Sequence, residues 1–339
     1  METVIMAIET SCDETAVAII KDGKEILANV VASQIDVHKK FGGVVPEIAS
    51  RKHLELINVV VAEALEKANL SFADITHYAV TYGPGLVGAL LVGVSCAKAL
   101  AFGDNKPLIG VNHIEGHIYA NFLTNPNIEL PVVCLIVSGG HTTLVKIENH
   151  GEYDFLGQTR DDAAGEAFDK IARALGYGYP GGPQIEQHAK GGNPEAIELP
   201  RAWLEEGSYD FSFSGLKSAV LNYLNRCEMK GIEINKPDIA ASFQEAVTDV
   251  LVQKTVSAAE KHKVETILLA GGVSANKYLR NRMIESASEK GLKVIYPPIE
   301  LCTDNGAMIG AAAHYKALRH DFAPLTLNAN PNLKFAKTN

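Results

Sequence analysis

The sequence has little of what marks secreted, membrane-bound or nucleic-acid-coating proteins. Only five of its 339 residues are cysteine, and no two of them form a Cys-x-x-Cys pair. An odd number of scattered cysteines argues against a disulfide framework and indicates free thiols in a reducing compartment. Acidic residues outnumber basic ones, 40 to 31, and the net charge is −9. This balance excludes a surface coated in basic charge for non-specific nucleic-acid binding, but it allows a nucleic-acid substrate held by a local patch or by a partner.

A secretion signal and a long hydrophobic run are also missing. The start, "METVIMAIETSCDET", has no basic region ahead of its short apolar run and is typical of a first strand. The most apolar stretch, residues 86–102, is interrupted by Lys98 and by two glycines. It falls short of a membrane span and predicts a buried helix. We therefore expect a cytoplasmic protein with no membrane association.

The sequence contains an internal repeat. Apolar residues make up 47% of the chain and charged residues 21%, which suits two globular domains. Residues 5–33 and 133–159 share one layout: an apolar strand, a small or polar loop, a second strand, a turn and a third strand. Gly23 and Gly151 occupy the same turn at an offset of 128 residues. A tight hairpin turn favours glycine there because it requires positive φ.

Each hairpin is followed by a similar strand–turn–helix pattern. The pattern is "HYAVTYGPGLVGALLVGVSCAKALA" in the first half and "TILLAGGVSANKYLRNRM" in the second. A plan that recurs in both halves predicts a duplicated α/β fold, with two similar lobes and a central cleft. We place one lobe at residues 1–120 plus 305–339 and the other at residues 121–304.

The first turns of the two hairpins are candidate site loops. Residues 9–15, "ETSCDET", are acidic and include Asp13 and Glu14, whereas residues 137–143, "VSGGHTT", contain two glycines. Backbone amides exposed by glycines can cradle a phosphate. Carboxylates near a phosphate hold a metal, a nucleophile or a water. One glycine-rich turn is usually only a turn, but two at equivalent places in a repeat are a stronger signal.

Two further segments each have a structural and a functional interpretation. In "LLAGGVSAN" an apolar strand ends at two glycines, and Ser274 is expected to cap the helix that follows. The functional interpretation lays an adenosine against the glycines, with Asn276 in reach. In "DDAAGEAFDKIARALG" the apolar residues recur at helical spacing. Asp169 lies off that stripe, as either a solvated helix residue or a site residue.

The segment "VNHIEGHIYA" places His113 and His117 four residues apart. Asn112 follows a short strand and predicts a helix N-cap, with Glu115 completing a capping box. At about 100° per residue the histidines lie one above the other, and Glu115 lies about 200° from His113. The pair can share a metal that Glu115 cannot easily reach. Zinc peptidase motifs need a glutamate directly after the first histidine (H-E-x-x-H) or directly before the second (H-x-x-E-H). Those two positions are Ile114 and Gly116 here, so the segment matches neither motif.

A third metal ligand has to come from elsewhere in the chain. The dipole at a helix N-terminus disfavours imidazolium, so we expect the rings to stay neutral and able to bind metal. Asp304 in "LCTDNGAMIGAAA" is the best candidate, contributed by the second lobe; the alternative is a simple N-cap of the helix that follows. Two histidines and one carboxylate with open positions suit Fe(II) or Zn(II).

Nearly the whole chain resembles the bacterial TsaD family of tRNA adenosine threonylcarbamoyltransferases, relatives of the KEOPS catalytic subunit. The resemblance runs from "IMAIETSCDETAVAI" to "CTDNGAMIGAAA" and includes "GGVVPEIASRKH", "TYGPGLVGALLVG", "NHIEGHIYA", "LIVSGGHTTL", "DDAAGEAFDK", "YPGGP", "FSFSGLK" and "LAGGVSANKYLR" in that order. It implies the actin-like ATPase (ASKHA) fold. It also implies a metal-dependent acyltransferase that moves the threonylcarbamoyl group from threonylcarbamoyl-AMP to N6 of the adenosine 3′ of the anticodon, in tRNAs reading codons that start with A, and releases AMP.

Site residues follow from the same resemblance, motif by motif. Metal ligation falls to His113, His117 and Asp304, with iron as the usual metal of the family. Acyl-adenylate binding falls to Ile136, Val137, Ser138, Gly139, Gly140, Asp169, Gly182, Glu186 and Asn276. Glu186 departs from the family, in which aspartate is common at this position. The base that takes the N6 proton stays open among Asp13, Glu14 and His141.

The negative net charge then requires local basic sites and partners to hold tRNA. Such sites are Lys39–Lys40, Arg51–Lys52 and Lys277–Arg282. The resemblance implies two partners, TsaB, a related inactive protein, and TsaE, an ATPase. The apolar residues 86–102 and the segment "PEIASRKHLELINVVVAEAL" either supply a partner surface or are ordinary core.

Two alternatives share the fold. A small-molecule kinase would phosphorylate with ATP and would not need His113 or His117. A non-catalytic ATP-binding regulator would need neither the acidic loop nor the three metal ligands.

Overall fold

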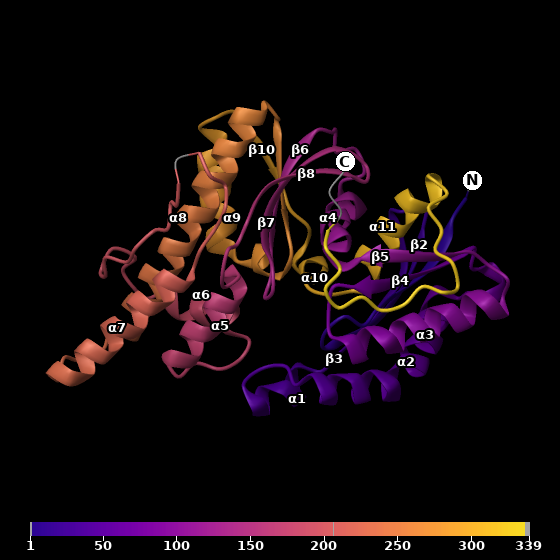
Figure 1. Ribbon diagram of the computed structural model, residues 1–339, viewed down its shortest axis with the longest axis horizontal. Coiled ribbons are helices and arrows are strands. Elements are labelled where there is room, and N and C mark those ends of the chain that lie inside the picture. Colours follow the sequence, from indigo (N-terminus) through magenta and orange to yellow (C-terminus); the bar gives the residue numbers. More distant parts are fainter. Residues whose placement is uncertain (1, 206, 336–339) are drawn as a thin grey trace. The chain divides into compact units, whose positions relative to one another are not determined.

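The computed structural model describes residues 2–205 and 207–335, which divide into two compact units (Figure 1). One unit comprises the chain up to Glu129 together with the segment that begins at Pro297, and the other is Leu130–Tyr296. Each unit is built on a five-stranded sheet. Among the described residues, the five cysteines form no disulfide. None of the described helices combines the length and apolarity that crossing a membrane requires.

The first unit begins with an antiparallel three-stranded meander and continues with parallel strands and helices. Its elements in chain order are β1 (Val4–Glu9), β2 (Glu14–Lys21), β3 (Glu25–Ser33), α1 (Ile35–His38), η1 (Lys39–Phe41), α2 (Pro46–Ala68), η2 (Phe72–Asp74), β4 (His77–Gly83), α3 (Val87–Gly103), β5 (Leu108–Asn112), α4 (His113–Thr124), α10 (Ile299–Cys302) and α11 (Gly306–Leu318). The strand order is β3-β2-β1-β4-β5, and β1 pairs in parallel with β4.

The second unit repeats this plan. Its elements are β6 (Val132–Val137), β7 (Thr142–Asn149), β8 (Glu152–Gln158), α5 (Ala164–Ala174), α6 (Gly181–Ala189), α7 (Ser214–Lys230), α8 (Lys236–His262), β9 (Thr266–Ala270), η3 (Gly272–Ala275), α9 (Lys277–Ser288) and β10 (Lys293–Ile295). Read from the other edge, its strand order is β8-β7-β6-β9-β10.

The predicted duplication is confirmed strand by strand. Strands β1 and β6 begin and end 128 residues apart, and so do β2 and β7. In both units the first strand pairs antiparallel with the second and parallel with the fourth. The two hairpin glycines adopt positive φ, +69° at Gly23 and +86° at Gly151, as the turn geometry requires.

The division between the units differs from the lobes expected from the sequence. Helix α4 runs on to Thr124 and packs against α11 and α10, so residues 121–129 and 297–304 belong to the first unit. Asp304 therefore lies in the same unit as His113, and the prediction that it comes from the other lobe is wrong. The chain re-enters the first unit at Pro297, ahead of Asp304, and α11 then packs on β1 and β2 of the first sheet.

Alternate residues of the central strands face two different helix layers. Met6 and Ile8 of β1 pack into one apolar cluster with α2 and α3. On the other face, a Cβ built on Gly306 would lie 2.5 Å from the backbone nitrogen of Ala18, so the small residues of α11 allow the helix to lie directly on the sheet. The buried helix predicted for residues 86–102 is α3, although Phe102 at its end is 74% exposed.

Candidate functional site

Two histidines and one carboxylate of the first unit converge on a small region. The side-chain atoms of His113, His117 and Asp304 that could bind a metal all lie within 4.8 Å of one another. One oxygen, Asp304 Oδ1, lies 3.2 Å from His117 Nε2 and 3.5 Å from His113 Nε2. Both histidines are buried. The arrangement has the donor set that the sequence predicted, one acceptor oxygen facing two ring nitrogens.

Helix caps fix where these side chains begin. Asn112 caps α4 by accepting a hydrogen bond from the Ile114 amide at 2.9 Å, as predicted, so His113 is the first helical residue. Asn305 caps α11 by accepting from the Met308 amide at 2.9 Å. The alternative interpretation of Asp304 as a simple N-cap is therefore wrong, because the next residue has that role.

A buried carboxylate that the sequence interpretation missed supports His113 from the other side of its ring. Glu9, the last residue of β1, is fully buried. Its Oε2 accepts a hydrogen bond from Thr81 Oγ1 at 2.5 Å and lies 3.0 Å from His113 Nδ1. Its Oε1 accepts from the Ser11 amide. The repeat could have indicated a special role for Glu9, because the equivalent residue of the second unit is Val137 and an acid is unusual at the end of a buried strand.

These charges make the site attractive to a cation. Burial alone would lower the pKa of His113, but the carboxylates of Asp304 and Glu9 outweigh burial and raise the pKa to about 9. Burial likewise opposes ionisation of Glu9, yet the charge and hydrogen bond of His113 lower its pKa. The expectation of a neutral imidazole is thus wrong for His113 in the metal-free protein. Two acids around one ring outweigh the helix dipole, and the position takes up a proton when no metal is bound.

The acidic loop that follows β1 belongs to the same unit. Asp13 is buried, and its backbone oxygen accepts from the Gln34 amide at 3.0 Å. Glu14 accepts from Ser33 Oγ at 3.0 Å. Burial and the nearby carboxylates of Asp304 and Asp13 raise the pKa of Glu14 to about 10. Glu14 therefore keeps its proton at neutral pH unless a cation binds close to it.

The glycine-rich loop of the second unit is a tight turn with exposed backbone. The Ser138 amide donates to the His141 carbonyl at 2.8 Å, and the His141 amide donates to Ser138 Oγ at 3.1 Å. Gly139 and Gly140 are exposed, with open space where their side chains would be. Helix α5 starts against this loop, because a Cβ on Gly165 would lie 2.5 Å from the Ser138 carbonyl oxygen. A glycine-rich turn next to a helix N-terminus suits an anion.

Two more site candidates of the second unit are tied to neighbouring helix starts. Asp169 on α5 accepts from the Gly181 amide at 2.6 Å, so it links α5 to α6, and burial raises its pKa. It is therefore no solvated helix residue. Gly182 follows in α6 with open space beside it. Glu186, farther along α6, accepts from the Lys277 amide at 3.0 Å, which links α6 to the start of α9.

The cap of α9 is Asn276, not Ser274 as expected. Asn276 Oδ1 accepts from the Leu279 amide at 2.9 Å, and Asn276 Nδ2 donates to Gln244 Oε1 at 3.0 Å. Ser274 lies in the short turn η3, where its backbone oxygen accepts from Arg280 Nε at 2.5 Å. The 3₁₀ turn displaces the helix start by two residues, which the sequence pattern did not reveal.

Comparison with known proteins places these sites in a family. The family model described as TsaD, tRNA N6-adenosine threonylcarbamoyltransferase, matches residues 25–311. The chain belongs to this family. It is 62% identical over 332 residues to the tRNA N6-adenosine threonylcarbamoyltransferase of Moorella thermoacetica, covering 98% of this chain and 97% of that protein. It is 57% identical over 334 residues to the protein of that name from Clostridium perfringens strain SM101, covering 98% of both chains.

Solved structures extend the likeness to the fold. HypF from T. kodakarensis superposes with a TM-score of 0.62 at 16% identity, covering 94% of this chain and 48% of HypF. The chain thus spans about half the length of HypF. At this identity the comparison concerns the fold alone. It agrees with the duplicated ASKHA fold that the resemblance implied.

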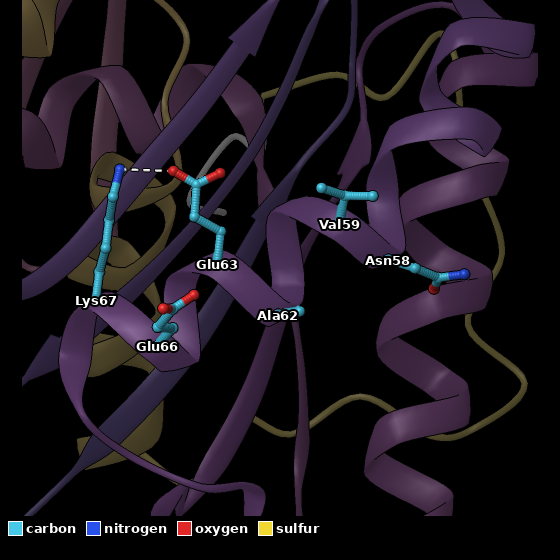
Figure 2. A pocket seen from close by; sticks show the side chains of 6 residues that line it. All are labelled: Asn58, Val59, Ala62, Glu63, Glu66 and Lys67. Carbon is cyan, nitrogen blue, oxygen red and sulfur yellow. Dashed lines mark ion pairs between the residues drawn. The ribbon is translucent and has the colours of Figure 1, made fainter.

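Within this family member, the outer face of α2 is an exposed surface with mixed chemistry. It borders a hollow of about 830 Å³ lined by Asn58, Val59, Ala62, Glu63, Glu66 and Lys67 (Figure 2). Figure 2 shows the ion pair between two of these lining residues, 2.7 Å between Lys67 Nζ and Glu63 Oε1. Leu54 and Val59 are 65% and 59% exposed. The helix is therefore core on one side, and on the other it exposes apolar side chains among polar and charged ones.

Several basic residues named as candidate tRNA contacts pair with acids of their own chain. Lys39 pairs with Asp36 at 2.9 Å, and Arg51 pairs with Glu47 at 2.8 Å. Arg282 pairs with Glu245. A tRNA phosphate would have to compete with these carboxylates for each cation, so these residues stay predicted contacts only.

Proposed function

We propose that this chain transfers the threonylcarbamoyl group from threonylcarbamoyl-AMP to N6 of the adenosine 3′ of the anticodon, in tRNAs that read codons starting with A. The observation that carries the proposal is the near full-length identity of 57% and 62% to proteins named tRNA N6-adenosine threonylcarbamoyltransferase. In this reaction the N6 amine attacks the carbonyl carbon of the mixed anhydride. The bond from that carbon to the phosphate oxygen breaks, AMP leaves, and N6 loses a proton.

One divalent cation would be held by His113, His117 and Asp304, with Fe(II) favoured and Zn(II) as the alternative. The donor set fits a metal: two imidazoles and a carboxylate converge, and no other described residue hydrogen-bonds the buried ring nitrogens of His117. When bound, such a cation supplies a Lewis acid that polarises or orients the acyl-adenylate. Metal analysis of His113→Ala tests the assignment. Full occupancy in that variant would exclude it.

The second unit would bind the acyl-adenylate. The amides of Ser138–Gly140 and the start of α5 would stabilise negative charge on the phosphate or on the carbonyl oxygen. Ile136 and Val137 are buried at the end of β6 and hold this loop in place. The remaining nucleotide contacts would come from the helix starts described above: Asp169, Gly182, Glu186 and Asn276. Glu186 would contact the nucleotide beside the Lys277 amide, to which it already hydrogen-bonds, if its longer side chain folds back.

The base for the N6 proton is one of Asp13, Glu14 and His141. Glu14 needs a nearby cation to ionise at neutral pH, because its pKa is raised to about 10. Single-turnover transfer by Asp13→Ala, Glu14→Gln and His141→Ala separates the three. The variant that loses the transfer step while it still binds AMP identifies the base.

The activity itself is tested by mass analysis of tRNA nucleosides. The tRNA is incubated with the chain and threonylcarbamoyl-AMP, with and without partner proteins, then digested to nucleosides. We expect threonylcarbamoyladenosine and an equal amount of AMP with the wild-type chain, and neither with His113→Ala. His188→Ala is a matched control, because that ring stacks on Tyr177 outside the metal cluster. Unmodified adenosine in every wild-type reaction would refute the proposal.

The exposed face of α2 would bind the partner TsaB, and TsaE would join the assembly. Support comes from the apolar side chains that this face leaves exposed, Leu54 and Val59. Ala62→Trp would place a bulky ring on this face and is expected to abolish pairing with TsaB in a pull-down. Asn225→Trp, on the exposed side of α7, is the control. Unaffected pairing of Ala62→Trp would contradict this surface.

A further inference from the structure

Glu9 is fully buried in the first unit and is absent from both groups of site residues assigned above. A carboxylate with no exposure needs compensating donors, and three surround it. The Ser11 amide donates to Oε1, the Thr81 hydroxyl donates to Oε2, and His113 Nδ1 lies 3.0 Å from Oε2. Ser11 follows β1 and Thr81 lies in β4, so these two donors fix the position of the carboxylate independently of the histidine.

The two nitrogens of His113 face different acids. Nδ1 points to Glu9 Oε2, and Nε2 lies 3.5 Å from Asp304 Oδ1. A carboxylate only accepts hydrogen bonds, so the contact with Glu9 requires a hydrogen on Nδ1. In the neutral ring, the form that binds a metal, the lone pair then lies at Nε2, the nitrogen that faces the predicted metal position. The Ser11 hydroxyl, 3.1 Å from Nδ1, can either donate or accept and does not decide the tautomer.

We infer that Glu9 is a positioning residue, which holds the hydrogen of His113 on Nδ1 and aims Nε2 at the proposed metal. The inference rests on the proposed metal centre. Carboxylates that accept from the second nitrogen of a ligating histidine fix its tautomer and orientation and raise its basicity. A purely structural Glu9 would satisfy the Ser11 and Thr81 donors equally well but would leave metal affinity unchanged.

The test variant is Glu9→Gln, which keeps the size of the side chain. Its amide presents one oxygen and one NH₂ to positions that all need an acceptor. If the oxygen faces Ser11, the NH₂ faces Nδ1 and moves the ring hydrogen to Nε2, where it blocks metal. If the oxygen faces His113, the NH₂ opposes the Ser11 amide. In both orientations Nε2 of His113 is less able to bind the metal.

The measurement is competitive titration of the metal-free protein with Zn(II) against a chromophoric chelator. We expect Glu9→Gln to bind Zn(II) about 10- to 100-fold more weakly, the usual effect of losing such a supporting carboxylate. The matched control is Glu115→Gln, a buried acid on α4 that lies outside the metal cluster, and its affinity should not change. NMR of ¹⁵N-histidine protein loaded with Zn(II) gives a second readout. The Nδ1-bound hydrogen of His113 should resonate far downfield in the wild type and move upfield in Glu9→Gln.

Wild-type affinity in Glu9→Gln would overturn the inference. So would weaker binding with an unmoved Nδ1–H resonance, because that result makes Glu9 purely structural. If Glu9→Gln does not fold, Thr81→Val removes only the hydroxyl that donates to Glu9 and should weaken Zn(II) binding by a smaller factor. An unchanged affinity there would also overturn it. Failure of the metal centre itself is distinguishable, because His113→Ala would then bind Zn(II) at full stoichiometry.

Discussion

Raising the pH should lower the stability of the metal-free protein and increase its affinity for a divalent metal, because loss of the His113 proton contributes to both effects. The pKa of His113 is raised from its ordinary 6.5 to about 9 by Asp304 and Glu9. At 1.36 kcal/mol per unit, this difference contributes at most about 3 kcal/mol of stability. Because the folded pKa lies above the unfolded one, the contribution is complete below about pH 6.5 and is lost as the pH rises through about 9.

Glu14 acts in the same direction over this range. Its pKa is raised to about 10, so the folded protein holds a proton that the unfolded chain has released. Stability therefore falls with rising pH on account of both groups. Metal binding shows the opposite trend, since the metal must displace the His113 proton. The apparent affinity should rise about tenfold per pH unit until the pH passes the pKa of His113.

The perturbation that tests His113 is Asp304→Asn, which removes the largest charge that raises its pKa and also removes a charge that raises the pKa of Glu14. Urea unfolding of the metal-free wild type should show stability falling across about pH 6.5 to 9, with a flatter profile in the variant. NMR titration of the ring assigns the change to His113. The control is Asp321→Asn, an acid that pairs with Lys316 just beyond α11 and should keep the wild-type slope. A flat wild-type profile, or a His113 pKa at or below 6.5, would refute the electrostatic reasoning.

Three substitutions test packing around the sites. Gly116→Ala places a Cβ 2.6 Å from a side-chain carbon of α11. The variant should lose about 1 kcal/mol of stability in urea unfolding, because overpacking outweighs the gain in helix propensity. The control Gly103→Ala, in open space at the end of α3, should not lose stability. Asn276→Ala removes a helix cap and should cost about 1 kcal/mol or more by the same assay, whereas the exposed Asn281→Ala should change stability by less than about 0.5 kcal/mol. Gly165→Ala pushes on the Ser138 carbonyl and should weaken AMP binding in calorimetry, with Gly103→Ala again as the control; unchanged AMP affinity would separate this loop from the nucleotide.

The parts of the fold that the sequence predicted are those set by local periodicity. Strand alternation and a turn glycine fix each hairpin, so a constant offset of 128 residues sufficed to align Gly23 with Gly151. The histidine pair was equally local, because an N-cap and a spacing of four residues place His113 and His117 on one face of α4.

The origin of Asp304 could not be read from the sequence, because no local pattern records which sheet a late helix packs on. Small residues such as Gly306 and Gly310 allow α11 to pack closely, but they do not indicate its partner. The partner is the first sheet, which makes all three predicted ligands neighbours within one unit. Glu9 escaped notice for a related reason. An acid beside a loop suggests solvent exposure, and only the fold shows that three donors enclose it.

The duplication explains how one loop design came to suit ions of opposite charge. Residues 9–14 connect β1 to β2, and residues 137–142 connect the equivalent strands β6 and β7. In each unit a glycine from a later loop packs against this connection, Gly85 against Ser11 and Gly271 against Val137. The backbone support is therefore shared, and the side chains differ. The first loop carries the carboxylates of Glu9, Asp13 and Glu14, and Asp304 together with Glu9 raises the pKa of His113, so this end of the first unit favours a cation. The second replaces them with exposed glycines beside the start of α5, so its amides favour an anion. The same connection between the first two strands of each unit is therefore a candidate cation site in the first unit and a candidate anion site in the second.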